Sequence, residues 1–189
     1  ERVTEVGIVL HDGEQVLETF SSLVNPERTI PDFIVKLTGI TNEMVAEAPY
    51  FYEIARKSVD MTEGASFVAH NARFDYGFIR AEFNRLGYTY SRRQLCTVKL
   101  SRRVMPGLPS YSLKKLCGHL DIALDRHHRA LEDALAAAQV LEYMLARESS
   151  PEQVKALVNR GIKETRLPEG ITLEQLHRIP ESCGVYYFH

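Results

Sequence analysis

The sequence predicts an α/β domain in which helices pack on the faces of a β-sheet. Two β-rich runs come first, and one compact apolar run then alternates with segments of helical spacing. This order is typical of layered α/β domains. The 189 residues, of which 44% are hydrophobic and 25% charged, suffice for one full core and a short appendage. No apolar run approaches the ~20 residues that a membrane-spanning helix requires.

The first two predicted elements are the strands of a hairpin. Residues 3–10 and 15–24 are rich in β-branched and apolar side chains, and an Asp-Gly pair lies between them. That pair is a common turn signal in hairpins. Pro26 and Pro31 punctuate the stretch that follows, and no helix or strand is assigned to it.

The remaining elements alternate between helices and one buried strand. Residues 65–69 form the compact apolar run that predicts the strand, and residues 74–86 carry apolar side chains at helical spacing up to Gly87. The strongest helical pattern covers 130–147, where leucine, alanine and methionine side chains fall on one stripe. Shorter helices are predicted over residues 50–60, 97–104, 112–119 and 152–159.

The composition changes after Arg147. Residues 1–147 form the predicted main domain, and a helix followed by a polar linker is expected over 148–170. Residues 171–189 bring a new apolar pattern and are predicted to be a C-terminal extension.

The charges are distributed unevenly along the chain. The net charge is −2, yet residues 91–115 contain seven Lys or Arg side chains and no Asp or Glu. Such a segment can hold a polyanion through its phosphates, although a solvated basic helix face gives the same pattern. The cysteines Cys96, Cys117 and Cys183 form no C-x-x-C pair, which disfavours a structural zinc site and favours a reducing, cytoplasmic compartment.

The first group of residues that could carry chemistry follows the predicted buried strand. The sequence Ala69-His-Asn-Ala-Arg-Phe-Asp75 places a polar turn after the strand and Asp75 at the start of a helix. Active groups of α/β folds commonly lie at the carboxyl ends of strands. The alternative is that Asn71 and Asp75 only cap the helix.

The second group opens the long predicted helix. His128 precedes the helix and Asp133 lies in its first turn. If the residues before the helix fold back, His128 can approach the Asp133 carboxylate, which suits an acidic metal site with a nearby base. A carboxylate in a first turn also complements the helix dipole without any catalytic role.

Together these two groups resemble the DEDD exonuclease superfamily. N-x-x-x-D after a strand, followed by H-x-A-x-x-D at the opening of a helix, is similar to its histidine-containing branch. That branch, DEDDh, includes the epsilon proofreading subunit of bacterial DNA polymerase III. The resemblance extends over residues 1–147, through the T-E-x-G pattern at 4–7, the G-I-T-x-x-M segment within 37–44 and the S-x-x-L segment within 108–116.

The resemblance implies a ribonuclease H-like fold, a mixed sheet flanked by helices. It implies hydrolysis of the 3′-terminal phosphodiester bond with release of nucleoside 5′-monophosphates. Two Mg²⁺ or Mn²⁺ ions, roughly 3.5–4 Å apart, would stabilise the attacking and leaving oxygens. Asp133 would bind a metal directly, Asp75 would hold the metal cluster through a water molecule, and His128 would be the general base.

The resemblance also implies a set of substrate-binding residues. Thr38, Gly39 and Ile40 would lie beside the terminal nucleotide. Asn71 and Phe74 would shape the turn between the strand and the helix. The expected substrate is the 3′ end of single-stranded DNA, with RNA as an alternative, in replication proofreading or repair and alongside a DNA polymerase.

The family's first motif, D-x-E, does not occur at its expected place. That motif belongs about ten residues before the T-E-x-G pattern, and counting back from Glu5 places it before Glu1. Glu1 and Glu5 belong to the pattern of the next strand and cannot replace it. We therefore expect a first strand with two further acidic ligands upstream of Glu1. Without it, the domain would be a nucleic-acid-binding module.

The C-terminal extension resembles the opening strand of a GIY-YIG endonuclease domain, as found in the excinuclease C subunit. Gly184-Val185-Tyr186 matches the G-I-Y half of the motif, so Tyr186 would be the candidate catalytic tyrosine. This resemblance implies a second nuclease domain fused to the exonuclease domain.

Overall fold

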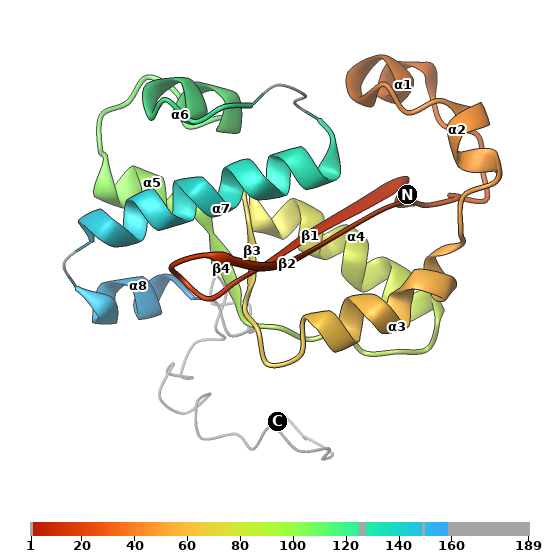
Figure 1. Cartoon of the computed structure of the whole chain (residues 1–189), viewed down its shortest axis with the longest axis horizontal. Helices are drawn as coiled ribbons and strands as arrows, with labels where there is room; N and C mark the ends of the chain where they lie inside the picture. The colour runs from red at the N-terminus through yellow and green to blue at the C-terminus, as the bar shows by residue number, and fades with distance from the viewer. Residues whose placement is uncertain (1, 125–127, 149, 159–189) are drawn as a thin grey trace, which may run out of the picture.

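The computed structural model describes residues 2–124, 128–148 and 150–158 (Figure 1). Its elements are β1 (Glu5–His11), β2 (Val16–Leu23), α1 (Asp32–Thr38), α2 (Asn42–Ala46), α3 (Phe51–Met61), β3 (Phe67–Ala69), α4 (Ala72–Arg85), β4 (Gln94–Cys96), α5 (Thr97–Val104), α6 (Leu113–His119), α7 (Ala130–Arg147) and α8 (Pro151–Leu157). Within these ranges, no helix is both long and apolar enough to cross a membrane.

The predicted hairpin is confirmed. β1 and β2 pair antiparallel, with Glu5 opposite Leu23 at the open end. The Asp12 carboxylate accepts hydrogen bonds from the backbone N–H groups of Glu14, at 2.8 Å, and Gln15, at 2.9 Å. Gly13 completes the turn with a φ of 108°, a conformation that glycine adopts without steric strain.

A second pair of strands lies beside the hairpin. β3 and β4 pair in parallel over three residues each, and α4 is the crossover helix between them. Among the described residues, β1 pairs only with β2 and β3 only with β4. The two sheets therefore stay separate, although α7 contacts both β1 and β3.

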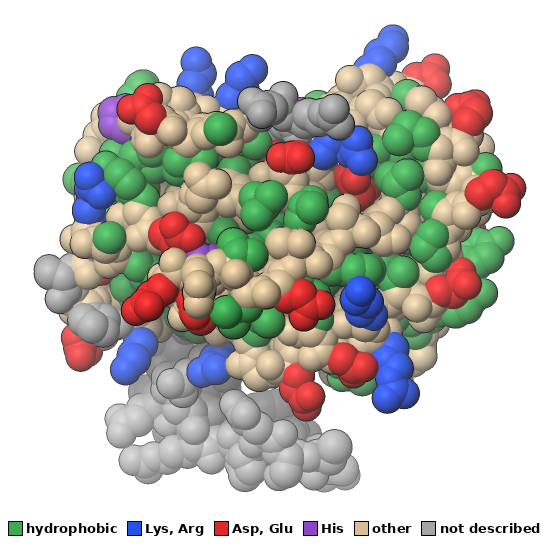
Figure 2. Space-filling view, in the orientation of Figure 1, with side chains coloured by type: hydrophobic (Ala, Val, Ile, Leu, Met, Phe, Trp, Pro, Cys, Tyr) green, Lys and Arg blue, Asp and Glu red, His purple; other side chains and the backbone are tan. Residues whose placement is uncertain are grey.

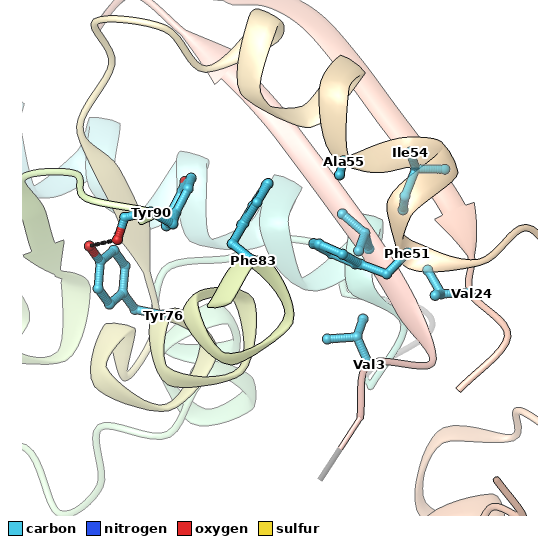
Figure 3. Packing of buried hydrophobic residues seen from close by; sticks show 9 residues of the cluster. Val3, Val24, Phe51, Ile54, Ala55, Tyr76, Phe83 and Tyr90 are labelled. Carbon is cyan, nitrogen blue, oxygen red and sulfur yellow. Dashed lines mark hydrogen bonds between the residues drawn. The ribbon is translucent and has the colours of Figure 1, made fainter. Parts of the chain in front are cut away.

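The hairpin lies between two layers of helices. Alternate side chains of β1 point to opposite faces, and Val6 and Ile8 face a core built with α3 and α4. Figure 3 shows Phe51 of α3 beside Phe83 of α4 in this core; their ring centroids are 5.1 Å apart. α7 crosses the strands in Figure 1 and packs extensively on β1.

A separate core forms between α7 and the short helices α5, α6 and α8. Leu100, Leu116, Val140 and Met144 are fully buried in it. α7 is therefore packed against the strands along one stripe and against the other C-terminal helices along another.

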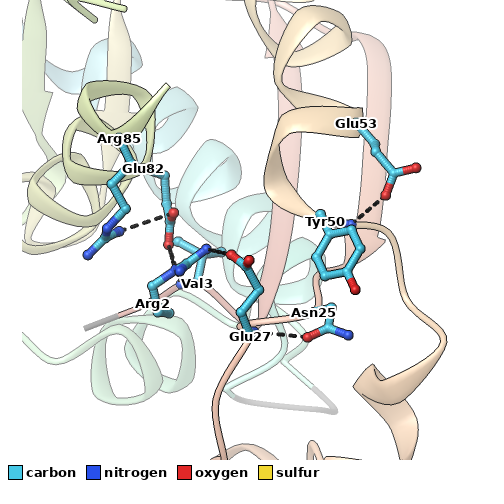
Figure 4. Close-up of polar contacts among 8 residues, drawn as sticks. All are labelled: Arg2, Val3, Asn25, Glu27, Tyr50, Glu53, Glu82 and Arg85. Carbon is cyan, nitrogen blue, oxygen red and sulfur yellow. Dashed lines mark hydrogen bonds and ion pairs between the residues drawn. The ribbon is translucent and has the colours of Figure 1, made fainter. Parts of the chain in front are cut away.

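A buried carboxylate joins the start of β1 to α4, as Figure 4 shows. Glu82 of α4 accepts hydrogen bonds from Arg2 Nε at 3.1 Å and from the Val3 N–H at 3.0 Å. Arg85 forms an ion pair with the same carboxylate at 3.1 Å, and the Glu82 side chain is only 3% exposed. Arg2 also pairs with Glu27, which lies beyond the end of β2.

Most of the predicted helices agree with the structure, and those over 97–104 and 130–147 have the predicted bounds. Three elements were not predicted. Helix α1 begins directly after Pro31, helix α2 is capped by the Thr41 hydroxyl, and β4 has only three residues. Of the helix and linker predicted over 148–170, the part from residue 159 onward lies outside the described residues, as does the extension predicted over 171–189.

Candidate active site

Asp75 lies in the first turn of α4, directly after the short strand β3. Asn71 directly precedes the helix. Its backbone adopts the left-handed conformation, with a φ of 76°, and its side chain makes no capping hydrogen bond. Its backbone carbonyl accepts the Phe74 N–H at 2.9 Å. Asn71 therefore shapes the turn through its backbone, and the interpretation of its side chain as a helix cap is wrong.

The carboxyl group of Asp75 has an unfavourable electrostatic environment. Asp75 keeps an exposed surface, but the protein atoms around the carboxyl group displace water and raise its pKa. Its own backbone N–H lowers the pKa, and the negative charge of Asp133 raises it further. Two carboxylates from helices far apart in the sequence thus lie within electrostatic reach of each other.

The residues before α7 fold back over Asp133. His128 has a left-handed backbone with a φ of 72°, and its N–H donates to Asp133 Oδ2 at 3.2 Å. Asp133 is also fixed by the first hydrogen bond of the helix, in which its N–H donates to the Arg129 carbonyl at 3.0 Å. The side chain of His128 is exposed. The structure therefore brings the backbone of His128 to the Asp133 carboxylate, and the role of its side chain as a base stays a prediction.

His70 is a further residue of this region that sequence reasoning missed. Its Nε2–H donates to the Tyr111 carbonyl at 2.8 Å, and its Nδ1 is 2.9 Å from the hydroxyl of Thr97, which is fully buried. His70 therefore joins the end of β3 to the start of α5 and to the loop before α6. Its position directly after the predicted strand is the sequence signal that could have identified it.

Phe74 lies on the surface beside Asp75. Its side chain is 60% exposed, and its ring centroid is 4.9 Å from that of Phe78, one helical turn later. A shallow hollow surrounds these rings, and it is lined by Asn71, Arg73, Phe74, Gly77, Phe78 and Ala81. The exposed ring of Phe74 in this hollow can receive a flat apolar group.

Thr38, Gly39 and Ile40 lie at the end of α1, whose Ile34 and Val35 pack in a small hydrophobic cluster with Ile40 and with Val45 of α2. The Thr38 hydroxyl donates to the Ile34 carbonyl and accepts the Ile40 N–H. Gly39 has a φ of 72° and ends the helix, and the Ile40 side chain is 2% exposed. Of these three residues, Gly39 offers an exposed backbone, whereas the Ile40 side chain belongs to the core.

The basic segment contains residues with different surroundings. Arg103 forms an ion pair with Glu148 at 2.9 Å, and Arg92 lies over the ring of Tyr90. Lys114 and Lys115 of α6 are exposed, and basic side chains project from the surface above α6 in Figure 2. Only part of the segment is therefore held by the protein's own groups.

Two carboxylates among the described residues, those of Asp75 and Asp133, are candidate ligands for a metal ion. Within the described residues, no group of three or more His, Cys, Asp or Glu side chains is arranged to hold a metal. Asp75 and Asp133 are hard oxygen donors of the type that Mg²⁺ and Mn²⁺ prefer. The carboxylate repulsion seen at Asp75 is the kind that a bound cation relieves.

A family model for exonuclease domains (RNase_T) matches residues 1–141. The chain is 36% identical to a DNA polymerase III of the PolC type from Caldanaerobacter subterraneus subsp. tengcongensis, over all of this chain and 15% of that protein. It is 41% identical to the Mycobacterium tuberculosis protein MT2247, whose name describes a candidate bifunctional exonuclease/endonuclease, over all of this chain and 30% of that protein.

A solved structure of exonuclease X in complex with 5′-overhanging duplex DNA is also similar. It is 28% identical with a TM-score of 0.65, and the match covers 82% of this chain and 89% of that one. The mixed α/β, ribonuclease H-like fold predicted from the sequence is thus confirmed. The chain spans less than a third of the length of the two curated relatives named above.

Proposed function

The chain belongs to the exonuclease family, and on that basis we propose that it is a metal-dependent 3′→5′ exonuclease. The reaction is hydrolysis of the terminal phosphodiester bond of DNA, with release of nucleoside 5′-monophosphates. The observation that carries this proposal is the approach of Asp75 and Asp133, which come from the first turns of two different helices.

Each residue of the site has a distinct role in the proposed reaction. Asp75 and Asp133 hold divalent metal ions, Mg²⁺ or Mn²⁺, which stabilise the charges on the attacking and leaving oxygens when bound. The exposed imidazole of His128 accepts a proton from the attacking water. The hydrogen bond from the backbone N–H of His128 to Asp133 supports this assignment because it holds the His128 backbone beside the carboxylate.

The other acidic ligands come, in our proposal, from a strand that lies between β1 and β3. Each of these strands pairs with one neighbour among the described residues, and α7 contacts both. A D-x-E sequence on a strand in that position would add two carboxylates to Asp75 and Asp133. Unpaired backbone groups at sheet edges favour such pairing.

The substrate is held by contacts on both sides of the site. We place Phe74 and Asn71 beside the last bases, because the exposed Phe74 ring can stack on a base. Thr38, Gly39 and Ile40 would contact the terminal nucleotide through the backbone, since the Ile40 side chain is buried.

Two features support DNA as the substrate and basic residues as its phosphate contacts. The relatives and structures similar to this chain include a DNA polymerase and a nuclease bound to duplex DNA. Lys99, Lys114 and Lys115 are exposed on α5 and α6, where they can contact phosphates without reading the sequence. We therefore also propose a role in replication proofreading or repair alongside a DNA polymerase, which the similarity to a polymerase of the PolC type supports.

The test is digestion of a 5′-labelled single strand by the full-length protein with Mn²⁺. Asp133→Asn should slow the reaction by at least ~100-fold, because a metal ligand contributes several kcal/mol to transition-state stabilisation. Glu132→Gln is the matched control, since Glu132 is exposed in the same turn, and it should digest at the normal rate.

The outcomes separate the candidate functions. Equal rates for Asp133→Asn and the wild type would overturn the site. Faster digestion of an RNA of the same sequence would make the protein an RNA exonuclease. Binding of the strand without any digestion would make it a nucleic-acid-binding module.

We also propose that the extension over 171–189 begins a GIY-YIG endonuclease domain with Tyr186 as a catalytic residue. The relative MT2247 supports this, because its name describes both activities and the match includes the whole of this chain. A closed circular DNA offers no end to an exonuclease. Nicking of such a circle by the full-length protein should therefore disappear in Tyr186→Phe and persist in Asp133→Asn, and a circle that stays intact with the wild type would refute the proposal.

A further inference from the structure

The start of α7 is attached to β1 by a single carboxylate. Arg129 donates to Glu5 from Nε at 3.1 and 3.2 Å and from Nη2 at 2.7 Å. The Ala130 N–H donates to the same group at 2.8 Å. The Glu5 side chain is 6% exposed, so water competes little with these contacts.

Gly7 brings the backbone of α7 against the same face of the strand. Residues two apart on a strand point to one side, so Gly7 and Glu5 share the face toward α7. A Cβ atom on Gly7 would lie 2.3 Å from the Ala130 carbonyl carbon and 2.3 Å from the Leu131 nitrogen. Glu5 therefore binds the first turn of α7 at the place where Gly7 lets it touch the strand.

The residues held by Glu5 lie between the two groups of the proposed chemistry. Arg129 and Ala130 are the first two of the four residues between His128 and Asp133, and the Arg129 carbonyl accepts the Asp133 N–H. The left-handed backbone of His128 comes immediately before Arg129. A shift of Arg129 would consequently move the hydrogen bond between the His128 N–H and Asp133.

The charges of this contact are balanced. The pKa of Arg129 is raised, first by its hydrogen bonds with Glu5 and further by the charge of that carboxylate. The pair adds no net charge beside Asp133, and a carboxylate at a helix start also interacts favourably with the helix dipole. Glu5 thus orders the turn without adding to the negative charge of the site.

We infer that Glu5 is a positioning residue, which acts through Arg129 and Ala130 to keep His128 and Asp133 in their reactive arrangement. This inference rests on the proposed function. It gives β1 a part in the reaction, although Glu5 is not one of the proposed ligands or substrate contacts. A displacement of about 1 Å at a reacting group can lower a rate about 100-fold.

The experiment compares Glu5→Gln with Glu82→Gln in the full-length protein. Glu82 is the control because it is also buried, binds arginine side chains and a backbone N–H, and lies at the opposite end of α4 from Asp75. We measure kcat and KM on single-stranded DNA, Mn²⁺ affinity by electron paramagnetic resonance, and thermal unfolding for both variants.

Glu5→Gln should lower kcat by about 10- to 100-fold and weaken Mn²⁺ binding, with a KM within about threefold of the wild type. Glu82→Gln should lose comparable thermal stability and keep its kcat. Glu5→Asp keeps the charge and should recover part of the loss. Arg129→Lys keeps the positive charge but cannot donate to Glu5 from two nitrogen atoms, so it should lower kcat less than Glu5→Gln does. If Glu5→Gln does not fold, Arg129→Lys takes its place in the comparison.

Two results would overturn the inference, and they differ from each other. If Asp133→Asn abolishes digestion but Glu5→Gln loses no more kcat than Glu82→Gln, Glu5 is only a structural residue and the proposed function stands. If Asp133→Asn digests like the wild type, the proposed function fails and the inference fails with it.

Discussion

The first turns of α4 and α7 each present one carboxylate to the candidate site, but different forces hold them. The start of α4 follows a three-residue strand, and its inner face is buried through Ala72 and Tyr76. The start of α7 is held by the buried carboxylate of Glu5 and by the close approach to Gly7. Apolar packing positions Asp75, whereas a polar contact and a glycine position Asp133.

This difference predicts which substitutions should disturb each of the two carboxylates. Apolar packing tolerates substitutions that keep the side-chain volume. The position of Asp75 on α4 should therefore change only when a substitution removes packing contacts. A buried carboxylate and a backbone contact tolerate neither loss of charge nor added volume. The position of Asp133 on α7 should therefore change when even a few atoms are altered at Glu5 or added at Gly7.

The largest expected effect is on the α7 side. Gly7→Ala places a methyl group where the backbone of Ala130 lies, and we expect the free energy of unfolding to fall by about 3 kcal/mol. Urea unfolding measures this change. Gly77→Ala is the control, because nothing lies within 4 Å of a Cβ there and no positive φ is needed; it should stabilise α4 by about 0.5–1 kcal/mol. A Gly7→Ala variant as stable as the wild type would contradict the close contact.

A smaller effect is expected on the α4 side. His70→Ala removes two hydrogen bonds that join β3 to α5 and to the loop before α6. We expect a loss of about 1–2 kcal/mol in the free energy of unfolding. His119→Ala, at the exposed end of α6, should change stability by less than about 0.5 kcal/mol. If the two variants unfold at the same urea concentration, His70 does not hold these segments together.

The smallest expected effect reports on the charge of Asp133. Burial raises the pKa of the Cys117 thiol, and the Asp133 carboxylate raises it further. Removal of that negative charge favours the thiolate, so Asp133→Asn should lower the pKa of Cys117. A ¹³C NMR titration of labelled cysteine measures the shift, and Glu132→Gln should leave the pKa unchanged. An unchanged pKa in Asp133→Asn would place Asp133 further from α6 than the structure does.

The sequence predicted the elements that carry long patterns. α7 was found with its observed bounds because its apolar stripe runs for five turns, and the hairpin was found from its turn. Helix α1 was missed because Pro31 was interpreted as a break, although a proline suits the position before a helix. β4 has three residues, which is too short for strand alternation to be visible.

The candidate site was predicted in the same uneven way. Asp75, His128 and Asp133 stand in motifs that resemble those of the exonuclease family, and that resemblance selects them. His70 and Glu5 act through partners 27 to 125 residues away, and no local pattern reveals such contacts. Glu5 also fits the alternation of its strand, which hid its contact with the start of α7.

The central claim is that Asp75 and Asp133 act together at one site. A double-mutant cycle on kcat tests it most directly, with Asp75→Asn, Asp133→Asn and the double variant of the full-length protein, each with Mn²⁺ and single-stranded DNA. Groups that act as a unit are not additive, so we predict that the double variant is no slower than the slower single variant, within about threefold. If the two single effects multiply in the double variant, the carboxylates act independently and the claim is wrong.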